Sequence, residues 1–402
     1  MPAAERKEPS VRDKTDVVEI GIPRTLFGVG AIAKIGDVIQ RFGAEKVLVV
    51  TDKGIMAAGV ADKVLDALKA AGVETDVYDE TPFEAPVSAI MEVAKRIREK
   101  GYALVVGVGG GSSMDTAKTS THLAGNPGLT AEDLIKWKPF KKVIPWVAVP
   151  TTAGTGSEWS AWAAITTDST DGIHYPYMTP NNYPDAVIID PALYLNVPPR
   201  VTAETGTDVL AHAYDAFISP KASIVSDLFA SFAIKMVAKS LRRAYAKGHT
   251  YLDDRYNMAI AASFAMLAMS MTGPSLIHLG NEHLGDITLI PHGRAMGVLM
   301  VAVMEFDLMA DPAKFRQLAE FFGENTACLS DIEAGELAIA AVRRLLDDLE
   351  MPQTLTEVGV GEDKIPELAK ELAEGWRADV MKWACCRDMT TEQAVALYKH
   401  IL

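Results

Sequence analysis

The first half of the chain alternates short apolar runs with amphipathic stretches, from about residue 17 to about residue 195. A short apolar run predicts a buried strand, and apolar residues that recur every three or four positions predict a helix with one buried face. Strands are predicted at residues 46–50, 74–78, 102–108 and 143–149, and helices at residues 60–71 and 87–100. Because strands that alternate with helices form parallel sheets with helical crossovers, we expect an α/β architecture here.

The pattern changes at the sequence Asn196-Val-Pro-Pro-Arg200. Two consecutive prolines interrupt regular structure, and the apolar residues that follow recur at helical spacing. A chain of 402 residues is also longer than one hydrophobic core usually serves. We therefore predict two domains, an α/β domain over residues 1–197 and an all-α domain over residues 198–402.

Composition and charge narrow the classes of function. The net charge of -14 argues against nucleic acid as a partner, because nucleic-acid binding depends on clustered lysine and arginine. No uninterrupted apolar stretch reaches the roughly 18 to 20 residues that cross a bilayer. Residues 1–16 lack the basic head and apolar run of a secretion signal, and three cysteines are too few for a disulfide framework. These features predict a cytoplasmic protein without a membrane partner.

Three consecutive glycines follow the strand predicted at residues 102–108 and open the next helix. Glycines let a phosphate approach the backbone, and a helix start offers unpaired N–H groups at its positive end. The run is not the GxGxxG dinucleotide fingerprint, and a plain tight turn is an equally weighted alternative. The residues of this motif that we assign to a phosphate-bearing cofactor are Gly109, Gly110, Gly111, Ser112 and Asp115.

Polar residues also follow two other predicted strands. Asp52 lies at the carboxyl end of the strand at residues 46–50, where an acid can bind both ribose hydroxyls of an adenosine and repel a 2′-phosphate. This placement favours NAD over NADP, and the competing interpretation is an Asp that caps the next turn. The loop after the strand at residues 143–149 is rich in hydroxyl side chains. Its candidate cofactor-binding residues are Thr151, Thr152, Thr155 and Ser157.

A set of histidines lies in the helical half. Asp208 and His212 are four residues apart, which places both on one face of a helix. His278 and His292 follow, separated by a predicted helix end and a Pro-His-Gly turn. Three imidazoles and one carboxylate around a divalent ion leave a position open for a substrate oxygen, and mixed nitrogen and oxygen ligands suit iron or zinc. Structural histidines without a metal are the alternative.

Taken together, these segments resemble the iron-containing (group III) alcohol dehydrogenase family from about residue 18 to the C-terminus. Residues 109–118 are similar to its glycine signature, residues 150–158 to its threonine-rich loop, and residues 202–213 to its ligand helix. The resemblance implies a Rossmann-like domain on an all-helical domain, the fold shared with dehydroquinate synthase, with the dinucleotide between them. It implies NAD and Fe²⁺ as cofactors, with Zn²⁺ as the other possible ion, and a homodimer or larger homo-oligomer. The ligands that it implies are Asp208, His212, His278 and His292.

One departure from the family concerns the proton that leaves with the hydride. The family commonly has a second histidine four residues beyond the one matched by His278, and here Glu282 occupies that position, with His283 beside it. Both are therefore candidate catalytic residues. A ribose hydroxyl of the dinucleotide is a third candidate for the proton path, and the sequence does not rank the three.

The expected activity is hydride transfer between a small alcohol or aldehyde and the nicotinamide. In this reaction the metal acts as a Lewis acid on the substrate oxygen. One rival is an NAD- and metal-dependent lyase or cyclase of the dehydroquinate synthase type, which would show no net NADH formation. The other is a non-enzymatic assembly protein, which would bind NAD without turnover.

Overall fold

The computed structural model describes residues 20–168, 174–288 and 290–402. Its first half is built on a six-stranded sheet in which all neighbouring strands are parallel. In spatial order the strands are β1 (Thr25–Phe27), β8 (Ala186–Ile189), β5 (Trp146–Pro150), β4 (Leu104–Gly109), β2 (Lys46–Val50) and β3 (Glu74–Tyr78). The strands β8, β5 and β4 are buried along their whole length, as expected for a parallel sheet that is covered on both faces.

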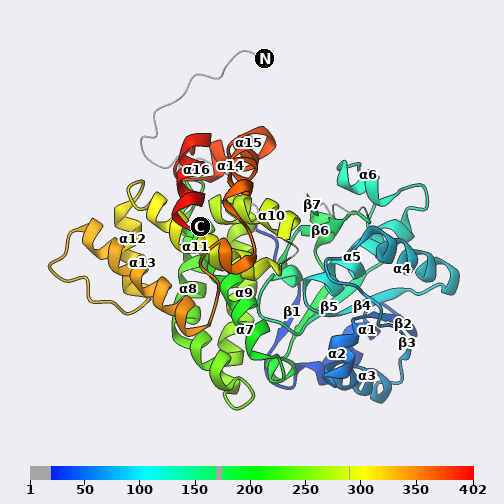
Figure 1. Cartoon of the computed structure of the whole chain (residues 1–402). Helices are drawn as coiled ribbons and strands as arrows, with labels where there is room; N and C mark the ends of the chain where they lie inside the picture. Colours follow the sequence, from blue (N-terminus) through cyan, green and yellow to red (C-terminus); the bar gives the residue numbers. More distant parts are fainter. Residues whose placement is uncertain (1–19, 169–173, 289) are drawn as a thin grey trace.

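Six helices accompany this sheet: α1 (Ile35–Gln40), α2 (Lys53–Ala57), α3 (Val60–Ala70), α4 (Val87–Lys100), α5 (Gly111–Gly125) and α6 (Ala131–Ile135). The helix α4 shows why they pack as they do, because Ile90, Val93 and Ile97 recur at helical spacing and are all buried. It ends at Gly101, whose φ of 68° is the left-handed conformation that glycine adopts easily. The helices α4 and α5 pack side by side (Figure 1).

The structure confirms an α/β layer and corrects two of the four predicted strands. The predictions at residues 46–50 and 74–78 coincide with β2 and β3. The strand predicted from residue 102 begins at Leu104, because the backbone N–H of Tyr102 still donates to the carbonyl of Ile97 at the end of α4. The strand predicted from residue 143 begins at Trp146, because Val143 lies 59% exposed outside the sheet.

The order of the strands creates a switch point between β2 and β4. From β2 the chain crosses to β3 at one edge, whereas from β4 it crosses to β5 in the opposite direction. The loops that follow β2 and β4 therefore diverge and leave a crevice at the carboxyl ends of the strands, where ligands of open α/β sheets bind. Beyond this sheet, β6 (Trp162–Thr166) and β7 (His174–Met178) form a separate antiparallel pair.

The second half is helical, and the residues described after Ile189 contain no strand. Its helices are α7 (Pro199–Ile218), α8 (Ile224–Lys247), α9 (Leu252–Thr272), α10 (Leu276–Thr288), α11 (His292–Asp307), α12 (Pro312–Phe321), α13 (Asp331–Asp348), α14 (Ile365–Ala373), α15 (Gly375–Ala384) and α16 (Thr391–His400). The helices α7, α8 and α9 pack against one another, and α11 packs against α7, α10 and α13.

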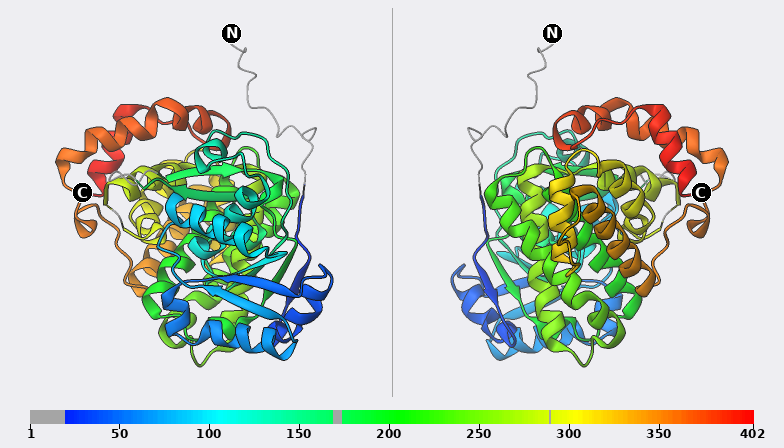
Figure 2. Two further views of the ribbon diagram at one scale, coloured as in Figure 1. Left: turned by 90° about the vertical axis from the view of Figure 1, so that its right-hand side faces the viewer. Right: turned by 90° about the vertical axis from the view of Figure 1, so that its left-hand side faces the viewer.

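Figure 2 shows how the α/β half and the helical half are arranged in the molecule. The α/β half occupies one side of the molecule and the helical half the other, with the C-terminal helices α14–α16 at one end. Within the described ranges, no helix taken singly has the length and apolar character of a membrane span. The helical segments Leu252–Thr272 and Leu276–Gly285 meet at a bend of 103°. Taken as a pair, they pass that test by length and composition.

Candidate active site

Four predicted metal ligands converge in the helical half. Asp208 and His212 lie one turn apart on α7, His278 lies in the first turn of α10, and His292 is the first residue of α11. The Oδ1 atom of Asp208 lies 3.6 Å from Nε2 of His212, 3.9 Å from Nε2 of His278 and 3.6 Å from Nε2 of His292. The structure thus places each of the three histidines near Asp208, but His212 lies outside the group whose ligand atoms all approach one another.

The cluster fits a divalent cation better than it fits a self-sufficient polar core. Oδ1 of Asp208 and Nε2 of His278 are buried, have no hydrogen-bond partner among the described residues and lie 3.9 Å apart. Buried polar atoms are normally satisfied, so atoms of this kind that point at one another indicate a missing partner. Ligand atoms of Asp208, His278 and His292 lie within 4.8 Å of one another. One oxygen and three nitrogen donors suit iron or zinc.

Burial sets the protonation of these groups when no cation is present. Burial raises the pKa of Asp208 to about 7, because a buried carboxylate loses its hydration. Burial lowers the pKa of His212 well below its usual value, and the nearby His278 and His292 lower it further. Burial also acts to lower the pKa of His278, but the hydrogen bond and charge of Asp215 outweigh burial, and that pKa is raised.

A close contact between α11 and α7 places His292 in the cluster. Pro291 is the N-cap of α11, so the helix begins at His292 itself. A Cβ atom on Gly293 would overlap the backbone carbonyl of Glu204 on α7, one turn before Asp208. The glycine of the Pro-His-Gly turn therefore lets the start of α11 press against α7, and this approach holds His292 beside Asp208.

Sequence reasoning missed two buried groups that contact this cluster. Asp215 is fully buried on α7, and its Oδ2 atom lies 2.7 Å from Nδ1 of His278. A usable signal was present, because Asp208, His212 and Asp215 are spaced i, i+4 and i+7 and share one helix face. Asn281 is a second missed neighbour, with its amide Nδ2 2.6 Å from Nδ1 of His292.

The predicted nucleotide-binding residues gather at the switch point of the sheet. Asp52 follows β2, and its Oδ1 accepts a hydrogen bond of 3.0 Å from the backbone N–H of Ile55, so it caps α2. Its Oδ2 accepts a hydrogen bond of 3.1 Å from the hydroxyl of Ser113, at the start of α5. The capping interpretation of Asp52 is therefore correct, and the same carboxylate also lies beside the glycine run.

The glycine run is shaped by close approaches that a side chain would block. Gly109 has a φ of +151°, and a Cβ atom there would lie 2.5 Å from Oγ of Ser113. A Cβ atom on Gly110 would lie 3.0 Å from Oγ1 of Thr152, and one on Gly111 would lie 3.0 Å from Cγ2 of Thr155. The start of α5 and the threonine loop therefore lie close together, and the absence of side chains on the glycines makes room for this contact.

Three of the predicted cofactor residues are engaged within the protein. Asp115 Oδ1 accepts hydrogen bonds from the hydroxyl of Ser157 at 2.7 Å and from Nζ of Lys118 at 3.2 Å. Lys118 is fully buried, and burial lowers its pKa. The hydroxyl of Ser112 accepts a hydrogen bond of 2.9 Å from the backbone N–H of Glu84. These side chains hold the loops in place, whereas Thr151 Oγ1 is buried with no partner among the described residues.

The threonine loop also reaches the helical half. A Cβ atom on Gly154 would lie 2.7 Å from Cβ of Thr205 on α7, three residues before Asp208. A Cβ atom on Gly156 would lie 2.5 Å from Cβ of Met266 on α9. One loop therefore contacts both the glycine run and the helix that carries two of the metal-ligand candidates.

The two candidate catalytic residues face the C-terminal helices. Oε2 of Glu282 lies 3.7 Å from Nε of Arg377 on α15, and Arg377 also donates to Glu371 at 3.2 Å. Nε2 of His283 lies 3.6 Å from Oε1 of Glu367 on α14. Glu282 lies one turn beyond His278 on α10, and its charge acts on that imidazole.

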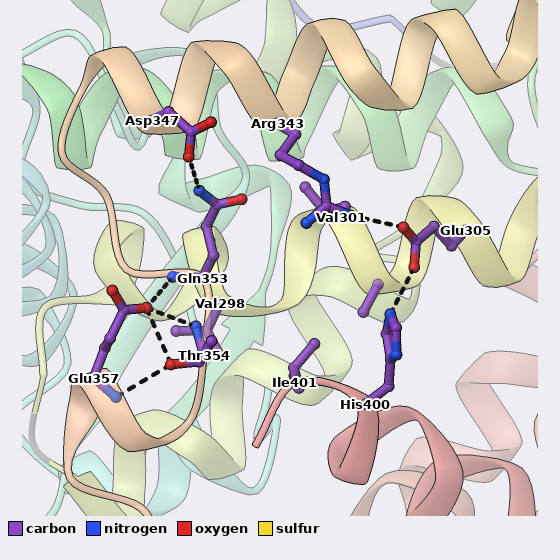
Figure 3. Close-up of a pocket in the computed structure, with 11 residues that line it drawn as sticks. Val298, Val301, Glu305, Arg343, Asp347, Gln353, Thr354, Glu357, His400 and Ile401 are labelled. Carbon is purple, nitrogen blue, oxygen red and sulfur yellow. Dashed lines mark hydrogen bonds and ion pairs between the residues drawn. The ribbon is translucent and has the colours of Figure 1, made fainter.

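A cavity of about 460 Å³ lies elsewhere, between α11, α13 and the end of α16 (Figure 3). Its polar side chains pair with one another: Arg343 with Glu305 at 2.7 Å, His400 with Glu305 at 3.1 Å, and Gln353 with Asp347 at 2.6 Å. Glu305 lies thirteen residues along α11 from His292, about 20 Å at the rise of an α-helix. Paired side chains at this distance do not contribute to the chemistry of the histidine cluster.

A cluster of candidate metal ligands beside a crevice of the dinucleotide-binding type is what we expect of a metal-dependent enzyme that uses a nicotinamide cofactor. Comparison with known proteins agrees with this class. Residues 23–191 match the family model "Iron-containing alcohol dehydrogenase", and residues 202–402 match "Fe-containing alcohol dehydrogenase family, C-terminal". The chain belongs to the iron-containing alcohol dehydrogenase family.

Individual relatives cover most of the chain. The choline dehydrogenase of Bacillus subtilis (strain 168) is 38% identical over 349 residues, which are 86% of each protein. The NAD-dependent methanol dehydrogenase of Bacillus methanolicus is 32% identical over 94% of this chain and 98% of its own length. A solved structure of 1,3-propanediol oxidoreductase, 32% identical, covers 96% of this chain and 100% of its own with a TM-score of 0.89.

These comparisons confirm the predicted fold and activity class. The chain is an NAD(H)-linked alcohol dehydrogenase or aldehyde reductase, and membership in the family implies that it binds iron. The relatives named above are dehydrogenases and an oxidoreductase, so they favour this activity over the alternative lyase and assembly functions.

Proposed function

We propose that Asp208, His212, His278 and His292 hold one divalent ion, and that this ion is the catalytic centre of the enzyme. The observation that supports this proposal is the convergence of buried ligand atoms without hydrogen-bond partners on α7 and α10. Ferrous iron is the expected native ion because of the family, and zinc suits the same donors.

We propose that NAD lies along the carboxyl ends of β2, β4 and β5. The unpaired N–H groups at the start of α5 suit its diphosphate, and Asp52 suits the ribose hydroxyls and disfavours NADP. Thr151, Thr152 and Thr155 line the facing loop. Ser112, Asp115 and Ser157 keep both loops in place through the hydrogen bonds described above.

When bound, the metal supplies a Lewis acid for the substrate oxygen and NAD supplies a hydride acceptor. The buried side chains of α7 and α10 would shield the substrate oxygen from bulk water on one side, whereas His292 of α11 is 43% exposed and leaves the site open on the other. Oxidation of an alcohol releases one hydride and one proton. We assign proton acceptance to the carboxylate of Glu282, because it lies one turn beyond His278 on α10 and its charge acts on that imidazole.

The relatives suggest the substrate class. Their names include choline, methanol and 1,3-propanediol dehydrogenases, so we propose a small alcohol or its aldehyde as the substrate. We also propose a cytoplasmic homo-oligomer and a division into domains at residues 197 and 198. The two family models end and begin at residues 191 and 202, on either side of that division.

The test compares His278→Ala with His122→Ala. His122 is also buried and has one side-chain hydrogen bond, to Asn182 at 2.9 Å, so it controls for the loss of a buried imidazole. Metal per chain and NADH formation from a panel of small alcohols are measured on anaerobically purified protein. We expect His278→Ala to lose bound metal and to lose turnover by more than about 100-fold, since it removes a ligand itself. Unchanged metal content in His278→Ala would disprove the assignment.

A further inference from the structure

Asp215 lies behind the metal-ligand cluster, on the helix that carries Asp208 and His212. Its side chain is fully buried. Its Oδ2 atom is 2.9 Å from the backbone nitrogen of Ser275, 3.4 Å from the backbone nitrogen of His278 and 2.7 Å from Nδ1 of the same histidine. Three nitrogen atoms at the start of α10 therefore converge on one carboxylate oxygen of α7.

This arrangement fixes the tautomer of His278. Oδ2 of Asp215 already accepts from the backbone N–H groups of Ser275 and His278, so we assign it the acceptor role in the 2.7 Å contact and place the proton on Nδ1 of His278. A neutral imidazole with its proton on Nδ1 presents a lone pair at Nε2. That atom is buried without a hydrogen-bond partner in the described part of the chain, and it faces Oδ1 of Asp208 at 3.9 Å.

We propose that Asp215 is a positioning residue for the metal centre, holding His278 in the orientation and tautomer that offer Nε2 to the ion. The inference rests on the proposed metal site. A carboxylate on the far nitrogen of a ligand histidine also increases the electron density that the ligand donates.

The three candidate ligand histidines are supported in different ways. Nδ1 of His292 lies 2.6 Å from the amide of Asn281, a neutral group. Nδ1 of His212 has no hydrogen-bond partner among the residues that the structure describes. Nδ1 of His278 lies 2.7 Å from the carboxylate of Asp215, and the His278 ring stacks on His212 with centroids 4.6 Å apart. We infer that His278 is the ligand whose orientation is fixed by a carboxylate, and that the ring of His212 packs against it.

A purely structural role for Asp215 makes a different prediction. The same oxygen accepts from backbone N–H groups at the first turn of α10, so it also caps that helix. Loss of a cap lowers the stability of the metal-free protein, but it leaves the metal affinity of the folded protein unchanged. Metal affinity and stability must therefore be measured separately.

Asp307 offers a matched control. It is also a fully buried aspartate, at the end of α11, and its Oδ2 accepts a hydrogen bond of 2.9 Å from the hydroxyl of Tyr214 on α7. Its side-chain hydrogen bond goes to Tyr214 rather than to a ligand candidate, yet the charge of Asp215 acts on it. Asp307→Asn therefore removes a buried carboxyl group near the site without touching a ligand.

The experiment uses metal-free wild type, Asp215→Asn and Asp307→Asn. Zn²⁺ affinity is measured by competition with a chelator, the visible absorption of bound Co²⁺ reports ligand geometry, and thermal unfolding reports stability. We expect Asp215→Asn to bind Zn²⁺ about 10- to 100-fold more weakly and to alter the Co²⁺ spectrum. We expect Asp307→Asn to match the wild type in both. Asp215→Ser, with a smaller acceptor, replaces the amide variant if the latter does not fold.

The outcomes separate this inference from the proposed function. If wild type and Asp215→Asn bind Zn²⁺ equally with the same Co²⁺ spectrum, the positioning role is disproved and the metal site stands. If Asp307→Asn weakens Zn²⁺ binding as much as Asp215→Asn does, the effect is general electrostatics and the role is again disproved. If the wild type binds neither ion, the proposed metal site itself is wrong.

Discussion

At the scale of single residues, Gly109 shows how strictly the nucleotide edge is shaped. Its φ of +151° disfavours any residue with a Cβ, and that atom would lie 2.5 Å from Oγ of Ser113 and 3.5 Å from Oδ2 of Asp52. A side chain here would therefore strain the backbone and displace the two groups that hydrogen-bond each other beside the proposed ribose site.

Gly109→Ala is expected to lower the free energy of unfolding by about 1–3 kcal/mol and to weaken NADH binding. Urea denaturation and fluorescence titration with NADH measure the two effects. Gly128→Ala is the control, because no atom lies within 4 Å of a Cβ there and its φ is not positive. Equal NADH affinity in Gly109→Ala and wild type would show that the glycine run does not bind the dinucleotide.

Some residues of the site could be predicted from the sequence and others could not. The spacing of Asp208 and His212 is enough to place both on one helix face, and Asp215 extends the same face. By contrast, the pairing of Asp115 with Ser157 joins residues 42 positions apart. No local pattern reports such a contact, so both residues were predicted to bind cofactor although they hydrogen-bond each other.

At the scale of elements, the contact between α10 and α15 bears on the role of Glu282. Glu282 and Arg377 are both mostly buried, with side-chain exposures of 20% and 9%, and their charged atoms lie 3.7 Å apart. This pair ties the helix that carries His278 to the C-terminal helices. The same carboxylate is our candidate proton acceptor, so its structural and chemical roles need separate measurements.

A double-mutant cycle with Glu282→Gln and Arg377→Met separates these roles. Unfolding in urea is expected to give a coupling energy of about 0.5–3 kcal/mol, because the two side chains contact each other. We also expect Glu282→Gln to lower turnover at saturating metal, since an amide cannot accept the proton. Additive stability effects together with normal turnover would contradict both roles.

Local pattern predicted strands that are bounded by turns better than strands that depend on a distant partner. The strands β2 and β3 coincide with their predictions because each is bounded by turns in the sequence. The three residues of β1 form a strand only because β8 lies beside them, about 160 residues later in the chain. A strand that depends on so distant a partner carries no periodic signal of its own.

At the scale of the whole molecule, the threonine loop contacts both the α/β half and the helical half. Gly111 meets Thr155 at one end of this loop, and Gly154 meets Thr205 of α7 near the other. The sequence could predict an α/β half, a helical half and the chemistry of each. It could not predict the contact between the two halves. Where the backbones of distant segments approach closely, the only sign in the sequence is a single glycine, and a glycine does not identify its partner.

The central claim is that hydride transfer depends on a metal held by the four ligand candidates of the helical half. The most direct measurement takes the anaerobically purified wild type, removes metal with a chelator, and follows metal content and NADH formation before and after Fe²⁺ or Zn²⁺ is restored. We predict about one metal ion per chain, loss of turnover on its removal and recovery on its return. Turnover that persists in metal-free protein would contradict the account.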